Sequence, residues 1–265
     1  KPNYIIALTG QSNSQGCNAW YDPGEPDDQP HERIFGFNPT TQQWEIADLN
    51  AESLGAFWHK AKGWQSLAFH FARRLVEGYP DIRPGIINVG VGGQSIARWV
   101  KYAEGEKWFE FNDVRAKSIS VTQGDIYDLH VAQINAGLAH LDPDHQKVNV
   151  VLWHQGESDA DTDPVYYEDS VNRVIAQYRA NTWGGKQLPF IVGETTGADV
   201  GTNLGWETRN VQLRNLNIDA DPYTKCVSSA DLPTSDDDYG NGDRIHFGAR
   251  AQKEMGTRYR RAYQS

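Results

Sequence analysis

Short apolar runs alternate with amphipathic helical stripes along most of this 265-residue chain, and this alternation most limits the folds open to it. The runs that predict strands lie at residues 4–8, 85–89, 148–153, 190–192 and 225–228. Most of them are continuously apolar, as expected of parallel strands that are covered on both faces. Strands and helices in alternation predict a three-layer α/β/α domain with a doubly wound, mainly parallel sheet.

The helices expected between these strands show apolar side chains at helical spacing. Such stripes lie within residues 68–76, 127–141, 167–178 and 251–262. Asp163 followed by Pro164 is a typical helix start, because aspartate caps the free N–H groups and proline suits the first helical position.

One long segment departs from this regular pattern. Residues 19–64 are rich in Pro, Asp and Gly, with a possible hairpin at 33–37 and 43–47. Their apolar content is too low for a separate core, so the sequence predicts a single domain over residues 1–265 with a loop-rich excursion at 19–64. A second loop-rich stretch is expected at 195–206.

Composition excludes several classes of partner. The formal net charge is -10 and no basic stripe is present, which argues against nucleic acid. No apolar run reaches transmembrane length, so we expect no membrane insertion. The chain opens at Lys1 without a visible signal peptide, and we expect an extracellular, cell-surface or virion-associated protein. The oligomeric state stays open.

The two cysteines have no spacing typical of a metal site. Cys17 and Cys226 lack the paired Cys and His neighbours that zinc requires, and the sequence leaves open whether they form a disulfide. No metal and no cofactor are therefore expected.

A candidate nucleophile directly follows the first predicted strand. Ser12 lies in Gly-Gln-Ser-Asn-Ser-Gln-Gly at 10–16, which is also good turn chemistry. A serine hydroxyl needs a base and a group that fixes the tautomer of that base. Asp243 and His246, three residues apart near the other end of the chain, can supply both. The sequence therefore predicts a Ser, Asp, His triad.

Two further polar segments follow strands and can stabilise a developing oxyanion. Residues 90–95 are glycine-rich and can bring a bare N–H close to a ligand, and Gln155 offers a side-chain amide. The carboxyl ends of parallel strands meet at one sheet edge, so these segments and Ser12 are expected to lie together.

These motifs resemble the conserved blocks of the SGNH hydrolases in order and rough spacing. They are Gly-Gln-Ser-Asn at 10–13, Gly-Gly-Gln-Ser-Ile at 92–96, Trp-His-Gln-Gly-Glu-Ser-Asp at 153–159 and Asp-x-x-His at 243–246. They look most like the sialate O-acetylesterase and acetylxylan-type branch of carbohydrate esterases. The resemblance implies a flavodoxin-like SGNH hydrolase fold and a metal-independent serine esterase. Such an enzyme removes O-acetyl groups from an acetylated oligo- or polysaccharide through an acyl-enzyme.

The resemblance also implies roles for particular residues. Ser12 would be the nucleophile, His246 the base and Asp243 the third triad member. The N–H groups of Ser12 and Gly93 and the Gln155 side chain would form the oxyanion hole. The branch often has methionine where this chain has Ser14, which concerns the packing behind the nucleophile.

Other residues of these motifs are candidates for substrate contact or support. They are Gln11, Asn13, Gln94, Trp99, His154 and Glu157. His154 could touch substrate or lie in the core, and Trp99 could stack on a sugar or fill the core. Glu157 and Asp159 could replace Asp243 in the triad or hold the loops by hydrogen bonds, and we favour the second role. Trp20, Tyr21 and Trp206 are further candidates for sugar stacking.

Two alternatives remain at this point. A non-catalytic carbohydrate-binding or adhesive domain of a larger surface or tail-fibre protein would account for the abundant aromatics, but it has no need of a triad. A serine hydrolase for lipid or aryl esters would require an apolar cleft, and no long apolar run lies near Ser12.

Overall fold

A computed structural model describes residues 1–51, 54, 63–102, 123–160, 162–196, 204–216 and 221–265. Within these residues seven strands form one sheet in the order β3-β2-β4-β1-β5-β6-β7. Their bounds are β1 Tyr4–Gly10, β2 Phe35–Asn38, β3 Gln43–Ile46, β4 Pro84–Gly90, β5 Val150–His154, β6 Phe190–Gly193 and β7 Thr224–Val227. Neighbouring strands are parallel except β2 and β3, which pair antiparallel. The mainly parallel sheet expected from the sequence is confirmed.

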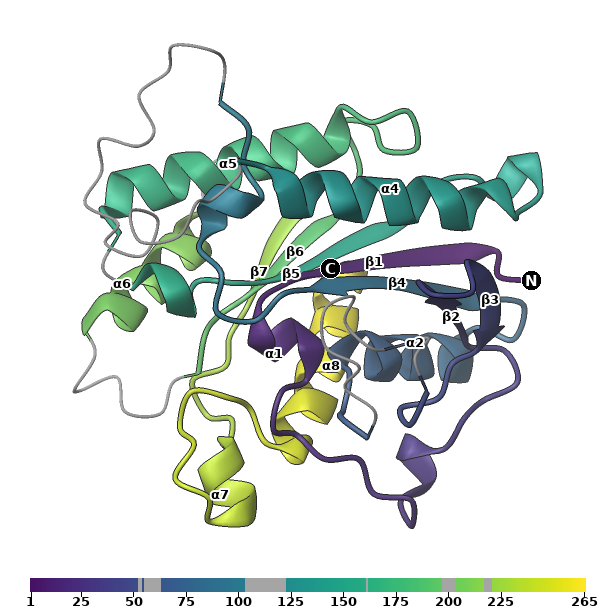
Figure 1. Ribbon diagram of the computed structural model, residues 1–265, viewed down its shortest axis with the longest axis horizontal. Coiled ribbons are helices and arrows are strands. Elements are labelled where there is room, and N and C mark those ends of the chain that lie inside the picture. Colours follow the sequence, from purple (N-terminus) through teal and green to yellow (C-terminus); the bar gives the residue numbers. More distant parts are fainter. Residues whose placement is uncertain (52–53, 55–62, 103–122, 161, 197–203, 217–220) are drawn as a thin grey trace.

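Helices cover both faces of this sheet. The α-helices are α1 Ser12–Gln15, α2 Leu67–Gly78, α4 Asp125–Ala139, α5 Pro164–Arg179, α6 Leu204–Asn215, α7 Ser235–Tyr239 and α8 Ala249–Gln264. Short 3-10 turns are η1 Pro26–Asp28, η3 Ile96–Arg98, η4 Pro143–His145 and η5 Glu157–Asp159. Helices α4 and α5 lie on one face and α2 and α8 on the other, which confirms the three-layer arrangement (Figure 1). In the described part of the chain, no helix combines the length and apolar character needed to span a bilayer.

The two cores explain why the central strands are buried at every position and mostly apolar. All seven residues of β1 and of β4 are buried. Successive side chains of a strand point to opposite faces. Thus Ile5 and Ala7 pack with α4 and α5, whereas Ile6 and Leu8 pack with α2 and α8. A central strand with helices on both faces has no solvent side that would favour polar residues.

The predicted helix starts are also present. The Asp163 carboxylate accepts a hydrogen bond from the Val165 N–H at 2.9 Å, and Pro164 is the first helical residue of α5. The Ser66 hydroxyl caps α2 in the same way, by accepting from the Phe69 N–H at 3.4 Å. These side chains satisfy N–H groups that have no partner inside a helix.

The predicted hairpin exists, but it belongs to the main sheet rather than to a loop excursion. Strand β2 pairs with β4 through Phe35 with Gly85 and Gly36 with Ile86. Phe37 enters the core beside α4, and the Trp44 indole donates to the Gly137 carbonyl at 2.9 Å. Apolar contacts of a few residues therefore turn part of the excursion into the edge of the sheet. Residues 52–53 and 55–62 of the excursion and residues 197–203 lie outside the described part.

The strand order places several loops together at one edge. Strand β1 lies between β4 and β5 in the sheet. Strands β2 to β4 form the part of the sheet on one side of β1, and the chain then crosses over to form β5 to β7 on the other side. Ligands of open α/β sheets bind beyond the carboxyl ends of strands at such a reversal. Helix α1 and the segments after β4 and β5 all follow strands at this edge (Figure 1).

Candidate active site

Ser12 is held at the edge of the sheet by a sharp turn between β1 and α1. Gly10 has φ 142°, and a Cβ there would lie 1.9 Å from the His154 carbonyl oxygen, so only glycine permits this approach of β1 to β5. The Gln11 N–H donates to that same carbonyl at 2.9 Å. Ser12 then begins the single turn of α1, with 7% of its surface exposed.

The Asp243 and His246 side chains form a hydrogen-bonded pair. His246 Nδ1 lies 2.7 Å from Asp243 Oδ2, and Asn18 Nδ2 donates to the same oxygen at 2.6 Å. Helix α7 fixes the turn that carries them, since the N–H of Ser235 donates to the His246 carbonyl and the N–H of Asp236 to the Asp243 carbonyl, both at 2.8 Å. The predicted Asp-His pair is therefore present.

Ser12 and His246 line one pocket of about 660 Å³. Its described lining residues are Gln11, Ser12, Gln15, Cys17, Trp64, Gly92, Gly93, Glu157, Ser158, Ala160, Trp206, Ile245 and His246. No hydrogen bond joins Ser12 to His246 among the described residues, and such bonds often tighten only when substrate is bound. The pocket leaves both groups open to a ligand.

Asn13 ties the nucleophile's helix to the end of the chain. Its Oδ1 accepts from the Phe247 N–H at 2.9 Å, and its Nδ2 donates to the Ile245 carbonyl at 3.2 Å. The same Nδ2 donates to Glu157 Oε1 at 2.5 Å, and Gln252 Nε2 donates to the Asn13 carbonyl at 2.9 Å. Asn13 is fully buried and does not line the pocket, so it supports the site rather than contacting substrate.

His246 has a raised pKa in this pocket. Burial opposes protonation of the imidazole, but contacts with Cys17 and Asp243 outweigh it and raise its pKa to about 9. Burial would also raise the pKa of Asp243, but hydrogen bonds from Asn18 and His246 hold it below its usual value. The carboxylate is thus poised to stabilise an imidazolium.

Two backbone donors of the predicted oxyanion hole border the pocket. Gly93 is exposed with φ 70°, and Gly92 packs against Ser12, since a Cβ on Gly92 would lie 3.5 Å from the Ser12 Cβ. Among the described residues, the N–H groups of Ser12 and Gly93 donate to no backbone or side-chain acceptor. Both can donate to an oxygen in the pocket.

The third predicted oxyanion donor does not line the pocket. Gln155 is fully buried, and its Nε2 donates to the Asp159 carboxylate and to the Gln94 carbonyl, the latter at 3.2 Å. Its Oε1 accepts from the Tyr167 hydroxyl at 3.2 Å. These bonds hold the amide inside the loop layer, so the expectation that it faces the substrate is not met in this structure.

Several motif residues hold loops in place. Gln11 lines the pocket, but its Oε1 also accepts from the Ser158 N–H at 3.1 Å. Gln94 lies outside the pocket lining, and its Oε1 accepts from Arg98 at 2.9 Å. His154 is a core residue that packs 5.2 Å from Phe247, and burial lowers its pKa to about 3. His154 therefore occupies the core, one of the two positions considered for it.

Glu157 and Asp159 have different surroundings. Asp159 accepts from the Ser95 hydroxyl at 2.7 Å and the Ile96 N–H at 2.9 Å, so it holds the loop after β4 as expected. Glu157 lines the pocket, accepts from Asn13, and burial raises its pKa. Neither carboxylate hydrogen-bonds to the His246 ring among the described residues, whereas Asp243 does.

Of the tryptophans considered for sugar contact, Trp99 lies in the core and Trp206 lines the pocket. Trp99 is fully buried, its indole N–H donates to the Thr9 hydroxyl at 2.9 Å, and its ring packs 5.6 Å from Trp153. Trp99 therefore occupies the core, one of the two positions considered for it. Trp206 does line the pocket, and its indole N–H donates to the Glu157 carbonyl at 3.2 Å.

Sequence reasoning missed four residues of the lining. Cys17 lies two residues after α1, and Trp64 precedes α2. Ala160 directly follows η5, and Ile245 lies between Asp243 and His246. The position of Ile245 inside Asp-x-x-His could have indicated its place, whereas nothing near Trp64 in the sequence links it to Ser12. Both cysteines are free, which answers the open question of their pairing.

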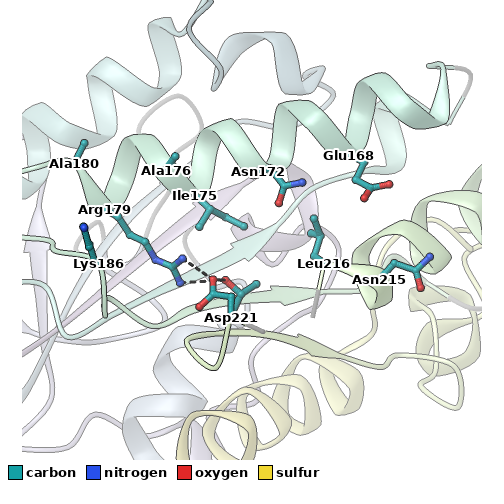
Figure 2. Close-up of a pocket in the computed structure, with 11 residues that line it drawn as sticks. Glu168, Asn172, Ile175, Ala176, Arg179, Ala180, Lys186, Asn215, Leu216 and Asp221 are labelled. Atoms are coloured by element: carbon teal, nitrogen blue, oxygen red, sulfur yellow. Dashed lines mark hydrogen bonds and ion pairs between the residues drawn. The ribbon is translucent and has the colours of Figure 1, made fainter. Parts of the chain in front are cut away.

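A second hollow of about 750 Å³ lies beside α5, away from Ser12 (Figure 2). Arg179 there donates to Asp221 at 2.5 Å, and Asn172, Ile175 and Glu168 point toward the hollow from α5. None of its described lining residues is a serine, cysteine or histidine. The described lining therefore offers no serine–histidine or cysteine–histidine pair, and the pocket at Ser12 is the candidate active site.

A parallel α/β/α sheet with a serine after its first strand and an Asp-x-x-His turn near its end defines a hydrolase of the SGNH type. Solved structures share this fold over nearly the whole chain. A protein from Arabidopsis thaliana superposes with a TM-score of 0.72 at 21% identity, covering 100% of this chain and 98% of that one. The structure titled NanS superposes with a TM-score of 0.66 at 19% identity, covering 100% of this chain and 98% of that one. A carbohydrate acetylesterase from Xanthomonas citri gives 0.63 at 20%, covering 98% of this chain and 56% of that one.

The chain belongs to the carbohydrate esterase family described as sialic acid-specific acetylesterase, whose family model matches residues 2–265. No curated protein matches the sequence at a significant level. The family and the fold together indicate carbohydrate acetylesterase activity.

Proposed function

We propose that this protein is a serine esterase that removes O-acetyl groups from an acetylated carbohydrate through an acyl-enzyme. The observation that carries the proposal is the Asp243–His246 pair, 2.7 Å apart, in the turn whose imidazole lines the same pocket as Ser12. A pure binding domain has no use for this pair.

The reaction follows from these groups in two halves. The Ser12 oxygen bonds to the acetyl carbon while its proton passes to the imidazole of His246. The carbon–oxygen bond to the sugar then breaks, and His246 returns the proton to the departing sugar oxygen. Water next attacks the acetyl-serine with His246 as base, which releases acetate and restores Ser12.

Two features support charge stabilisation during this reaction. Asp243 keeps the second ring nitrogen of His246 bonded and stabilises the imidazolium that forms. The N–H groups of Ser12 and Gly93 border the pocket and can donate to the oxyanion of the tetrahedral intermediate. We do not include Gln155 among these donors, because its amide is bonded to Asp159.

The test is the variant Ser12→Ala, assayed by acetate release from acetylated oligosaccharides. Loss of the nucleophile of such a triad costs roughly a million-fold in kcat, so no acetate release above background is expected. Organophosphate treatment should label the wild type on Ser12 and leave the variant unlabelled. Full activity of the variant would exclude this mechanism, and sugar binding without any acetate release by the wild type would favour the non-catalytic alternative.

A further inference from the structure

An aromatic ledge extends from the catalytic pocket across the neighbouring surface, and we define it by Trp64, Trp20 and Tyr239. Trp64 lines the catalytic pocket. Trp20 pairs with Trp64 in an isolated antiparallel β-bridge, and their rings lie 6.3 Å apart at 69°. Tyr239 lies next to Trp20, since its hydroxyl accepts from the Trp20 N–H at 3.0 Å.

The ledge is exposed and yet fixed in position. Trp20 is 50% exposed and Tyr239 is 40% exposed. The Gln65 amide donates to the Trp20 carbonyl at 3.3 Å, and the Tyr21 N–H donates to the Gly63 carbonyl at 2.9 Å. These bonds fix the backbone on both sides of Trp20, so little backbone entropy is lost when a ligand binds to the ledge.

A third hollow, of about 620 Å³, lies along the ledge, and Trp20 and Tyr239 both line it. The other lining residues are Tyr21, Asp22, Pro23, Glu25, Asp238, Ala249, Arg250 and Lys253. Aromatic faces beside carboxylates and ammonium groups match a pyranose ring, which has apolar C–H faces and hydroxyl groups at its edge.

The charges beside the ledge favour a neutral sugar. Lys253 is paired with Asp28 at 2.8 Å, and Arg250 with Asp238 at 2.5 Å. Among the described residues that line the catalytic pocket itself, none is a lysine or an arginine. A sugar carboxylate would therefore meet no unpaired lysine or arginine among the described lining residues of the catalytic pocket and of the hollow along the ledge.

We propose that Trp20 and Tyr239 form a second subsite, which stacks the sugar next to the acetylated residue of a neutral oligosaccharide. This inference rests on the proposed function, because the acetylated residue must enter the pocket at Ser12. The substrate is then an acetylated neutral chain of two or more sugars rather than a free sugar or an O-acetylated sialic acid.

The experiment compares acetate release from three acetyl esters: p-nitrophenyl acetate, a monoacetylated xylose and a monoacetylated xylotriose. An O-acetylated sialic acid is assayed with the wild type as a fourth substrate. The wild type should show a higher kcat/KM on the trisaccharide than on the monosaccharide. Trp20→Ala should lower kcat/KM on the trisaccharide by about tenfold more than on p-nitrophenyl acetate, as loss of one stacking contact of 1.4 kcal/mol would produce. Trp20→Phe retains a ring and should recover most of this loss.

The matched control is Tyr79→Ala, which removes an aromatic side chain of similar exposure at the end of α2, outside both hollows. The ratio of kcat/KM on the trisaccharide to kcat/KM on p-nitrophenyl acetate should be the same in this variant as in the wild type. If Trp20→Ala fails to fold, unacetylated xylotriose provides the test, since it should inhibit p-nitrophenyl acetate hydrolysis by the wild type and inhibit Trp20→Phe to a similar degree.

Each other outcome has a distinct meaning. Equal losses for Trp20→Ala on all three esters, or no inhibition by xylotriose, would overturn the subsite and leave the esterase intact. Preference of the wild type for an O-acetylated sialic acid would overturn the neutral substrate. Failure of the proposed function looks different, since the wild type would then release no acetate from any of these esters.

Discussion

His246 has a carboxylate partner in Asp243, whereas the buried carboxyl of Glu157 bonds to Asn13. This difference leads to a prediction about which acid supports the base. Asp243→Asn should lower kcat by about 10³- to 10⁴-fold, because an amide in place of the carboxylate favours the wrong tautomer of the imidazole. Glu157→Gln keeps an oxygen for Asn13 and should lower kcat far less. Steady-state kinetics of the two variants show which carboxylate supports His246. A larger loss of kcat for Glu157→Gln than for Asp243→Asn would assign this role to Glu157 instead.

Cys17 leads to a prediction about the pH profile. The contacts with Cys17 and Asp243 raise the pKa of His246 to about 9, and only the neutral imidazole acts as a base. Activity should therefore rise with pH until this pKa is passed. Cys17→Ala removes one cause of the increase, so the acidic limb of the kcat/KM profile should move to lower pH.

The control for this prediction is the second cysteine. Cys226→Ala changes a half-buried thiol on β7 that does not line the pocket, and its acidic limb should coincide with that of the wild type. An unchanged limb in Cys17→Ala would mean that Cys17 does not set the pKa of His246.

At the level of elements, α7 positions the Asp-x-x-His turn. Thr234 caps this helix, since its hydroxyl accepts from the Asp237 N–H at 3.3 Å and the Asp237 carboxylate accepts from the Thr234 N–H at 2.8 Å. Thr234 also bridges to Phe247, directly after His246. Loss of such a cap costs about 1 kcal/mol of unfolding free energy.

Thr234→Ala should therefore lower both stability and kcat. Chemical denaturation gives the loss of unfolding free energy, and the esterase assay gives the accompanying loss of kcat. Thr257→Ala removes a hydroxyl from α8 that donates to the Lys253 carbonyl at 3.2 Å and lies outside the described lining of the catalytic pocket, and it should leave kcat unchanged. Equal kcat for Thr234→Ala and the wild type would show that the turn holds its geometry without the cap.

Long buried elements could be predicted from sequence, and short ones could not. The strand at 4–8 and the helix that begins after Asp163 were predicted because their apolar pattern continues over several residues. Helices α1 and α7, with four and five residues, are too short for any periodicity to develop. Their positions depend on hydrogen bonds to distant residues, and a local pattern does not contain these.

The same limit applies to single residues of the site. The motifs predicted that Asp243 and His246 would lie together, because three residues of spacing is a local property. Trp99 was a possible sugar contact until its burial behind Thr9 was known, since sequence does not show which aromatic side chains reach the surface. Gln155 follows β5 as expected, but the bond to Asp159 that turns its amide away is set by the packed loops.

For the whole molecule, the site depends on a contact between the two ends of the chain. Asn13 and Phe247 are 234 positions apart in sequence and share a hydrogen bond of 2.9 Å. Helix α8 packs on α2 beneath this contact, where Gly256 lies so close that a Cβ would be 2.6 Å from the Leu67 carbonyl oxygen. The bond between Asn13 and Phe247 joins the turn after β1 to the segment before α8, so the packing of α8 on α2 also completes the site.

Buried histidines make the stability of the whole fold sensitive to acid. His70, His130 and His154 are fully buried, and burial lowers the pKa of each to about 3. In the unfolded chain these groups take up protons near pH 6.5, so between pH 6.5 and 3 the unfolded state binds more protons. The stability they contribute is present above pH 6.5 and is lost as the pH falls, by about 1.4 kcal/mol per pH unit for each histidine.

His130→Gln should reduce this dependence by the contribution of one histidine. The measurement is the unfolding free energy from urea titrations between pH 7 and 4, compared with the wild type. Tyr178→Phe is the control, since it removes the hydroxyl 2.7 Å from His130 Nδ1 and keeps the imidazole. It should lower stability at every pH while the slope stays as steep as in the wild type. If His130→Gln keeps the full slope, the acid sensitivity arises from groups other than this buried imidazole.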